Sequence, residues 1–544
     1  MIYMTSLLIS LFITITLIPI FRKAALHLHA VDFPNERKIH DHPMPKSGGL
    51  AIAIGTLVPI LLLSKADQFL VAISVGSLVL VIFGMVDDFK DLSYGVKFIG
   101  QAAAALIVIF IGGLEIRSLG MLLPDGVVLP HWVSIPLTLV VIVGVTNAIN
   151  LSDGLDGLAG GISLLSFMLI GYLAYQAENI LVALLCCGVL GSIFAFLRFN
   201  TYPAVIFMGD AGSQFLGFLA VTLALQVTQV NAPLSPLLPL VILGFPVLDT
   251  MTVMAERISN GHSPFMPDKN HFHHKLLRLG LFHTEAVVAI YLVQGFLVTV
   301  GYVFRFYSDW FLLVFYLAFS TLVLTGFFVA EKTNWRLKRF EVFDKIVKGR
   351  LRVLKDKSIL IKVSFKSMEV LFPAIFLTAC VLPGSVSSVI GIVLLIFAAL
   401  IFAVYFSNKR RLYLVLRVCF YLSVPFLVFI GDEALQTGPA RLRAVYTLLY
   451  AGLAFLALVT LKFTRRQKGF KASPMDFLIL ILALTIPNLP ESIQGYHLGG
   501  IAVKVIVLFF GFEVLMGELR GEFRWLALPI AAGLAFVGLK GLVM

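Results

Sequence analysis

Five short polar segments interrupt an otherwise apolar sequence, and the most acidic of them is GMVDDFKDLS, with Asp87, Asp88 and Asp91. Carboxylates this close together repel one another, and a divalent cation relieves that repulsion. Because few other donors accompany them, Mg²⁺ suits them best, with Mn²⁺ as a substitute. Mg²⁺ binds one or two carboxylates and keeps sites open for phosphate oxygens. A solvated helix end, with Lys90 as counter-charge, is the alternative interpretation.

The second segment, NAINLSDGLDGLAGG, combines amides and carboxylates with several glycines. A spacing of three residues places Asn147, Asn150 and Asp153 within one helical face, and Asp156 follows. The glycines allow a tight turn and a close approach of a ligand to the backbone. Helix capping by Asn and Asp is the alternative. Two amides and two carboxylates at one junction favour a binding site.

The third and fourth segments are PAVIFMGDAGS and SPFMPDKNHFHHKLLRLG. In the former, Asp210 precedes an apolar run, where free backbone N–H groups favour anions and an Asp either caps the helix or holds a metal. The latter carries His271, His273 and His274. Zinc is disfavoured, because the segment has no Cys and no HExxH spacing. Imidazole and lysine N–H groups aimed at a diphosphate explain it better than a solvated loop does.

The fifth segment, DFPNERKIHDHPMPKSGGL, supplies the cationic donors Arg37 and Lys46 next to several prolines. The general excess of Lys and Arg in cytoplasmic loops accounts for the same charges equally well.

The composition excludes a soluble protein. Hydrophobic residues make up 59% of the 544 residues and charged residues only 13%, and the mean hydropathy is +0.97. Apolar runs of roughly 17–22 residues recur along the chain, and each is long enough to cross a hydrocarbon core. The net charge of +12 resides in short loops between these runs, so it does not indicate nucleic-acid binding. The sequence predicts an all-α polytopic membrane protein.

The runs divide into about eleven spans within residues 1–330, including 213–228 and 233–252, and about seven within residues 367–544, including 474–488. Residues 331–366 form a basic linker, for which an amphipathic helix and a solvated loop are weighed equally. The Lys and Arg residues favour a topology with the N-terminus outside. All five polar segments then lie at the cytoplasmic ends of spans. Charged groups so close to hydrocarbon are functional candidates.

Together the five segments resemble the polyprenyl-phosphate N-acetylhexosamine-1-phosphate transferases (glycosyltransferase family 4), over residues 1–330. The DDFKD block is similar to the branch that uses UDP-N-acetylglucosamine. The branch that acts on UDP-N-acetylmuramoyl-pentapeptide typically has Lys in place of Asp91 and three consecutive histidines. Val205 is a departure, since relatives often carry Lys or Arg there.

The resemblance implies transfer of N-acetylhexosamine 1-phosphate, with GlcNAc as the expected sugar, from a UDP-sugar to undecaprenyl phosphate. This reaction releases UMP and initiates cell-surface polysaccharide synthesis at the cytoplasmic side of the bacterial inner membrane. It also implies a catalytic and Mg²⁺ centre at Asp87, Asp88 and Asp210. The implied substrate-binding residues are Asn147, Asn150, Asp153, Asp156, His271, His273, His274, Lys46 and Arg37.

Three alternatives stay open: a phospho-N-acetylmuramoyl-pentapeptide transferase, a membrane transporter and an inactive assembly scaffold. A transporter predicts inverted repeats and discontinuous spans at the midplane, and the sequence displays neither. Residues 367–544 match none of the motifs. A packing or oligomerisation module is favoured there over a role with the lipid-linked product. A homodimer and contacts with downstream glycosyltransferases are the further partners considered.

Overall fold

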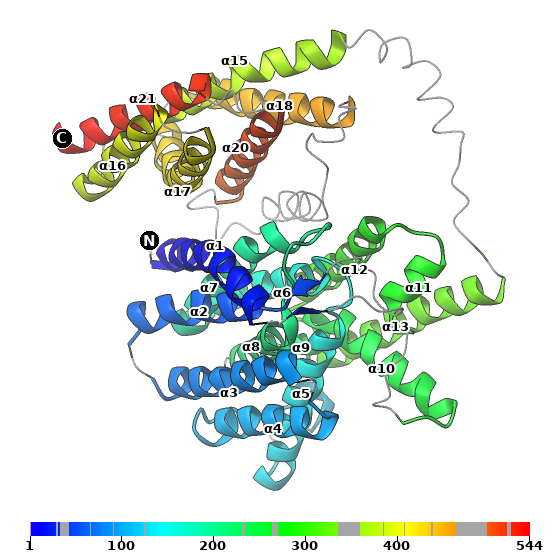
Figure 1. Ribbon diagram of the computed structural model, residues 1–544. Coiled ribbons are helices and arrows are strands. Elements are labelled where there is room, and N and C mark those ends of the chain that lie inside the picture. The colour runs from blue at the N-terminus through cyan, green and yellow to red at the C-terminus, as the bar shows by residue number, and fades with distance from the viewer. Residues whose placement is uncertain are drawn as a thin grey trace. The chain divides into compact units, whose positions relative to one another are not determined.

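Helices account for nearly all the regular structure of the computed structural model (Figure 1). The structure describes residues 2–28, 31–32, 43–65, 67–90, 92–124, 127–230, 234–263, 270–333, 335, 359–384, 386–406, 409–436, 439–463, 498–518 and 524–543. They form two compact units, one within Met1–Leu337 and the other within Lys338–Ala472 and Ile479–Met544. Among the described residues, 12 helices are long and apolar enough to cross a membrane. The predicted all-α polytopic membrane fold is confirmed.

The first unit consists mainly of long apolar helices. They are α1 (Ile2–His27), α2 (Gly48–Leu63), α3 (Gln68–Lys90), α4 (Tyr94–Phe110), α5 (His131–Leu151), α6 (Leu158–Gln176), α7 (Ile180–Asn200), α8 (Gly209–Val230), α12 (His283–Val303) and α13 (Asp309–Lys332). The shorter elements are β1 (Val31–Asp32), β2 (Met44–Pro45), η1 (Gly120–Leu122), α9 (Leu238–Ile242), α10 (Gly244–Ser259) and α11 (Phe272–Arg278).

Helix α8 forms the centre of the first unit. It packs against α2, α3, α5 and α6, and 94% of its apolar window is buried. Close approach depends on small residues, because a Cβ on Gly84 of α3 would lie 2.4 Å from Cα of Ala211. In a membrane such tight van der Waals packing is a main source of helix association. The packing therefore fixes the position of the first turn of α8, which carries Asp210.

The predicted single span at 233–252 is wrong, because α9 and α10 are separate helices that meet at Leu243. Pro246 has no N–H group to donate to the carbonyl of Ile242, so a continuous helix would lose that hydrogen bond. Side chains bind this carbonyl instead: Gln294 Nε2 donates to it at 2.7 Å and Ser166 Oγ at 3.2 Å. Away from water, a helix break is tolerated only with such replacement partners.

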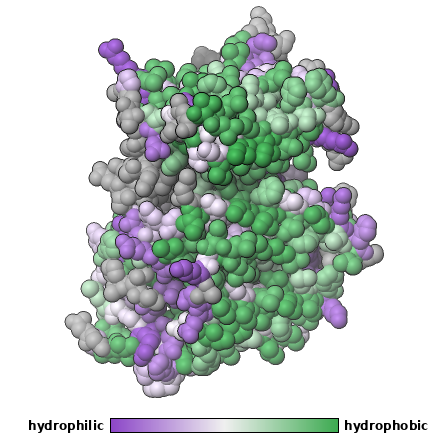
Figure 2. Space-filling model, turned by 90° about the vertical axis from the view of Figure 1, so that its left-hand side faces the viewer, coloured by the Kyte–Doolittle hydropathy of each residue, from purple (hydrophilic) through white to green (hydrophobic). Residues whose placement is uncertain are grey.

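The second unit contains the other long helices. They are α15 (Ile359–Val381), α16 (Ser388–Tyr405), α17 (Lys409–Gln436), α18 (Ala440–Phe463), α20 (Leu498–Glu518) and α21 (Arg524–Val543). Six of the seven predicted spans correspond to these helices, and the span predicted at 474–488 lies outside the described residues. So does most of the predicted basic linker at 331–366. Apolar side chains dominate much of the visible surface (Figure 2), as expected for helices that face lipid.

Two ion pairs join α17 to α20 inside the second unit. Arg417 pairs with Glu513, whose Oε1 also accepts a hydrogen bond from the Tyr421 hydroxyl at 2.5 Å. Lys504 pairs with Asp432, and both are less than 10% exposed. Charged groups buried in an apolar unit are costly unless they are paired. These pairs therefore fix the register of the two helices.

We expect Lys504→Met to destabilise the protein, because it leaves the Asp432 carboxylate buried without its counter-charge. Breaking such a pair costs about 3–5 kcal/mol, whereas replacing both partners by apolar residues is often neutral. The double variant Lys504→Met/Asp432→Leu should therefore recover most of the loss. Thermal unfolding in detergent measures both effects. A single variant as stable as the unmodified protein would contradict this account of the pair.

Candidate active site

Lys97 lies between two of the predicted carboxylates. Its Nζ atom is 2.6 Å from Oδ2 of Asp87 on α3 and 2.9 Å from Oδ2 of Asp210 on α8. The sequence analysis missed this residue, because a single lysine in the first turn of α4 carries no motif. Its ammonium group relieves part of the carboxylate repulsion for which the sequence analysis weighed a divalent cation against Lys90 as counter-charge.

Asp88 caps the central helix. Its Oδ1 atom accepts a hydrogen bond from the backbone N–H of Asp210 at 3.1 Å, and Oδ2 accepts one from Ala211 at 3.4 Å. Gly209 has φ +73°, and a Cβ there would lie 2.5 Å from Oδ2 of Asp88, so this position requires glycine. Two of the free N–H groups of α8 are thus satisfied by a side chain from α3. Asp210 does not have to cap its own helix.

The other polar groups around Asp210 come from three helices. Its Oδ2 atom also accepts a longer hydrogen bond, 3.4 Å, from Gln214 Nε2. On α5, Asn150 accepts a 2.6 Å hydrogen bond from the Ser213 hydroxyl of α8. Asp87 is buried, and its Oδ1 atom accepts from the backbone N–H of Leu92 at 2.7 Å. Asp91, the third carboxylate of the acidic segment, lies outside the described residues.

The turn between α5 and α6 carries the next two carboxylates. Helix α5 ends at Leu151, so the expectation that Asp153 shares a helical face with Asn147 and Asn150 is wrong. The chain turns at Ser152, just beyond the helix. The Asp156 carboxylate accepts a 2.9 Å hydrogen bond from the backbone N–H of Ala204. It therefore ties this turn to the loop that precedes α8.

Further contacts hold the same turn in place. The backbone N–H of Asp156 donates to Nε2 of His283 at 3.2 Å, and that ring stacks on Tyr202. Asn200 accepts a 3.0 Å hydrogen bond from the N–H of Gly157 and donates one to the carbonyl of Ile206. Neither Asn200 nor His283 lies in a motif, and only the fold brings them here.

Asp153 is the least engaged of these carboxylates. Its side chain has no hydrogen-bond partner among the described residues of the site. Burial, together with the charges of Asp210 and Asp156, raises the pKa of Asp153 to about 7. A carboxylate that has lost water without gaining a partner is available to a ligand.

The histidine segment contacts this turn. His273 is buried against Gly154, where an added Cβ would lie 2.3 Å from its Nε2 atom. The rings of His271 and His273 stack with centroids 5.8 Å apart, and the ring of His274 is 4.2 Å from that of His273. Burial, followed by the charges of the neighbouring histidines, lowers the pKa of His273 well below its ordinary value. His273 is therefore a neutral ring at pH 7.

Another carboxylate that the sequence analysis missed anchors the histidine segment. Asp249 on α10 is 2% exposed. Its Oδ2 atom is 2.9 Å from Nδ1 of His271, and its Oδ1 atom accepts a hydrogen bond from the backbone N–H of Phe272 at 2.7 Å. Asp249 lies 22 residues before His271, so no local spacing links the two.

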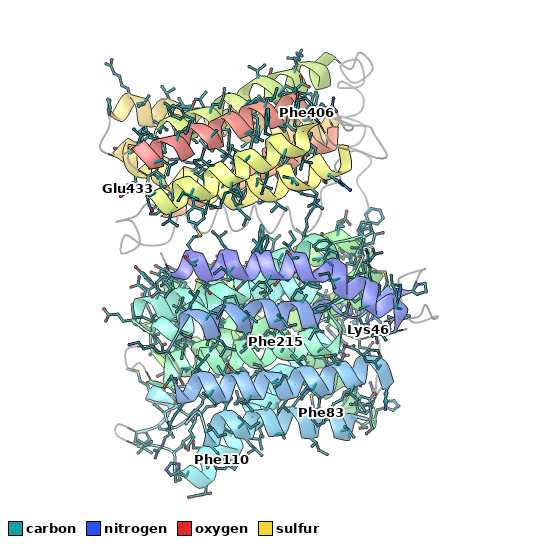
Figure 3. The ribbon with its side chains drawn as sticks, turned by 60° about the vertical axis from the view of Figure 1, so that its left-hand side comes forward. Lys46, Phe83, Phe110, Phe215, Phe406 and Glu433 are labelled. Carbon is teal, nitrogen blue, oxygen red and sulfur yellow. The ribbon has the colours of Figure 1, made fainter. Side chains whose placement is uncertain are left out.

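Lys46 lies at one end of the helices, whereas Phe215 of α8 lies farther in among them (Figure 3). The backbone after Lys46 pairs with the loop before α8, where the N–H of Gly48 donates to the carbonyl of Phe207 at 3.0 Å. Burial lowers the pKa of Lys46, but the charges of Asp32, 3.3 Å away, and of Asp88 and Asp210 outweigh it and raise the pKa. Arg37 lies outside the described residues.

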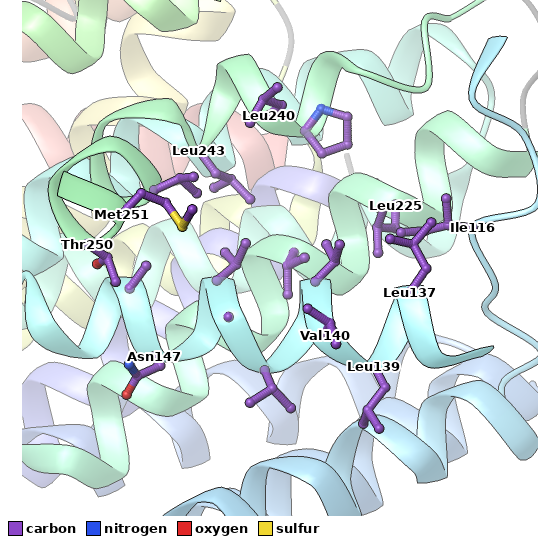
Figure 4. Close-up of a pocket in the computed structure, with 18 of the residues that line it drawn as sticks. Ile116, Leu137, Leu139, Val140, Asn147, Leu225, Leu240, Leu243, Thr250 and Met251 are labelled. Atoms are coloured by element: carbon purple, nitrogen blue, oxygen red, sulfur yellow. The ribbon is translucent and has the colours of Figure 1, made fainter. Parts of the chain in front are cut away.

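An apolar cavity of about 740 Å³ extends beside the polar site (Figure 4). Helices α4, α5, α9 and α10 supply most of its lining, which includes Val140, Leu240 and Met251. Asn147 and Thr250 are polar exceptions in this lining. Asn147, one helical turn before Asn150, therefore faces an apolar space.

The oxygen donors of the site fit Mg²⁺. Among the residues that the structure describes, no three Asp, Glu, His or Cys side chains come together in a preformed metal cage. Mg²⁺ does not need one, because it binds through one or two carboxylates and completes its shell with water and phosphate oxygens. Both oxygens of Asp87 and of Asp88 already hold hydrogen bonds. Among these three aspartates, Asp210 therefore has the greatest capacity for a metal, because Lys97 and Gln214 both contact its carboxylate at Oδ2.

Comparison with known proteins identifies the family of this chain. The sequence profile described as "Glycosyl transferase family 4" matches residues 70–228. The "Probable undecaprenyl-phosphate N-acetylglucosaminyl 1-phosphate transferase" of Bacillus subtilis (strain 168) is 36% identical over 344 residues, which cover 62% of this chain and 94% of the relative. The chain belongs to glycosyl transferase family 4.

Two other family 4 transferases have similar coverage. The "Undecaprenyl-phosphate alpha-N-acetylglucosaminyl 1-phosphate transferase" of Yersinia pestis is 34% identical over 329 residues, 59% of this chain and 88% of the relative. The protein of the same name from Escherichia coli (strain K12) is 33% identical over 359 residues, 63% of this chain and 95% of the relative. The profile match contains Lys97 and the carboxylates from Asp87 to Asp210, so this part of the site lies in the family's shared segment.

We expect Asp153→Asn to stabilise the protein at about pH 8 in the absence of metal and nucleotide. The unfolded chain releases the Asp153 proton at about pH 4, whereas the folded chain releases it at about pH 7. Stability is therefore lost as the pH rises between these values. The gain in stability should vanish at about pH 4. Thermal unfolding in detergent tests it, with the exposed Asp67→Asn as control. An equal gain at both pH values would contradict the assigned cause.

Proposed function

We propose that this family 4 transferase moves N-acetylhexosamine 1-phosphate, specifically GlcNAc 1-phosphate, from its UDP-sugar to undecaprenyl phosphate and releases UMP. The observation that carries the proposal is a polar site of carboxylates, lysines and histidines beside an apolar cavity. A water-soluble diphosphate and a lipid phosphate require these two environments. The printed names of the relatives contain the same lipid phosphate and the same sugar.

The acceptor lipid fits the cavity beside the site. Its prenyl chain would lie against apolar side chains such as Val140 and Leu240. Lipid tails are as apolar as these side chains, so the prenyl chain can pass from the bilayer into the cavity without exposure to water. Asn147 belongs to the same lining. Asn150, one helical turn later on α5, belongs to the polar site, so the cavity lies next to that site. The lipid phosphate would therefore reach the carboxylate region while its chain stays in the cavity.

The donor diphosphate fits between the lysines and histidines. Lys97 and Lys46 supply positive charge close to Asp210, and His273 supplies a neutral ring beside the Asp153 turn. Hydrogen bonds from charged donors to phosphate oxygens are among the strongest available to a protein. The unengaged Asp153 carboxylate is placed to accept hydrogen bonds from the nucleoside part of the donor.

Asp210 would hold Mg²⁺, with Asp88 and Asp87 next to it. When bound, Mg²⁺ would supply positive charge that neutralises the negative charge developing on phosphate oxygens during transfer. An oxygen of the lipid phosphate attacks the sugar-linked phosphorus. The bond from that phosphorus to the bridging oxygen breaks, and its electron pair leaves with UMP. The second pKa of a phosphate monoester is about 6, so the acceptor phosphate is already largely ionised at pH 7.

The two aspartates of the acidic segment then have supporting roles. Asp87 holds Lys97 through Oδ2 and the end of α3 through Oδ1, which leaves it little capacity to act as a base. Asp88 fixes the first turn of α8 and thereby the position of Asp210. The transfer would take place at the cytoplasmic face of a bacterial inner membrane, where UDP-sugars are available, and would initiate a cell-surface polysaccharide.

We expect the purified full chain to release UMP from UDP-N-acetylglucosamine only when Mg²⁺ and undecaprenyl phosphate are both present. Asp210→Asn should lower turnover about 100-fold or more, the scale on which preorganised electrostatic groups act. Asp88→Asn should lower turnover and also the unfolding temperature, because it weakens the cap of α8.

A coupled UMP assay and thermal unfolding in detergent measure these effects. Release without the lipid, or near-normal turnover of Asp210→Asn, would overturn the proposal. Release with a different UDP-sugar only would change the sugar and leave the reaction class in place.

A further inference from the structure

The two carboxylate oxygens of Asp249 contact the His271 ring and the backbone of the next residue. Its Oδ2 atom faces Nδ1 of His271, and its Oδ1 atom holds the next backbone N–H, that of Phe272. Opposite a carboxylate, the Nδ1 atom must carry a proton, since two acceptors cannot share a hydrogen bond. The ring can then gain or lose a proton only at Nε2. The hydrogen bond made by one ring nitrogen decides the state of the other.

We propose that Asp249 is a positioning residue that holds His271 with Nδ1 protonated and Nε2 directed to the diphosphate of the donor. In its imidazolium form, His271 donates from Nε2 to a phosphate oxygen, and the Asp249 carboxylate compensates the ring's charge. This inference rests on the proposed function, because it assigns a role within the same site.

Two observations connect this pair to the site. The His271 ring stacks on His273, with an interplanar angle of 8°, and His273 lies against Gly154 beside Asp153. Burial and the neighbouring histidines lower the pKa of His273 and keep it neutral. The two stacked rings therefore differ in their surroundings. His271 faces the Asp249 carboxylate at 2.9 Å, whereas His273 packs against Gly154.

The position of Asp249 on α10 also depends on the break in the helix. Thr250 and Met251, the next residues, line the apolar cavity. Since α10 begins anew at Gly244, the rotation of this helix is set independently of α9. One side of α10 thereby faces the cavity while Asp249 faces the histidine segment.

The test is a double-mutant cycle with Asp249→Asn and His271→Gln. The Asn side chain keeps the size of Asp and can still accept from Phe272, but its amide donates to Nδ1 and leaves the ring neutral. Each single variant should weaken UDP binding, measured by calorimetry with MgCl₂, and lower turnover by about 10–100-fold, as the loss of an outer partner does at metal sites. The double variant should be no worse than His271→Gln alone.

Asp309→Asn is the matched control. Asp309 is also buried and also accepts a hydrogen bond from a backbone N–H, that of Met121 at 2.7 Å. It lies on α13, however, and this contact joins α13 to η1. We expect this variant to lower the unfolding temperature without changing UDP affinity or turnover per folded molecule. Asp249→Glu, which keeps the carboxylate, should retain more UDP affinity than Asp249→Asn. Asp249→Ser, which removes the carboxylate, replaces Asn in the cycle if that variant does not fold.

Full UDP affinity and turnover in Asp249→Asn would overturn the inference. So would a double variant in which the two losses multiply, because Asp249 would then act independently of His271. Failure of the proposed function would give a different result. The double variant would still bind UDP no worse than His271→Gln alone, but the unmodified protein would release no UMP from UDP-N-acetylglucosamine with undecaprenyl phosphate.

Discussion

The hydrogen bonds from the first turn of α8 to the Asp88 carboxylate are the constraint on which the site depends. Helix α8 is buried along almost its whole length, so its free N–H groups need a partner within the protein. Asp88 supplies that partner from α3. This joins two motifs far apart in the sequence and places Asp210 beside Lys97. Gly209 permits the contact because a side chain there would displace Asp88.

Apolar length and polar interruptions were sufficient to predict the helices and most of the polar segments that meet at the site. Helix ends were harder to predict, since Asp153 falls beyond α5 only because the chain turns at Ser152. The break at Leu243 depends on Gln294 and Ser166, distant residues that bind the freed carbonyl. A sliding window over 233–252 contains no information about them.

Lys97 and Asp249 escaped prediction for a common reason. Each is a single charged residue whose partners lie on other helices, so neither forms a cluster in the sequence. Spacing arguments find groups that are close along the chain, whereas these ion pairs exist only after the helices have packed. A lone charge near the end of an apolar helix is the one signal available, and it also fits simple positive-inside topology in the case of Lys97.

Charge balance distinguishes the site of the first unit from the ion pairs of the second. In each of the two ion pairs between α17 and α20, Arg417 with Glu513 and Lys504 with Asp432, one cation faces one carboxylate. The charges balance, so these pairs serve helix packing. Around Lys97 and Lys46 the site gathers Asp87, Asp88, Asp153 and Asp210. Carboxylates therefore outnumber lysines before any phosphate arrives. A diphosphate donor and a lipid phosphate add further negative charge, and close like charges cannot remain ionised without a compensating cation. This excess supports the proposal that a divalent ion accompanies the substrates, and it explains why stability alone would not select such a cluster.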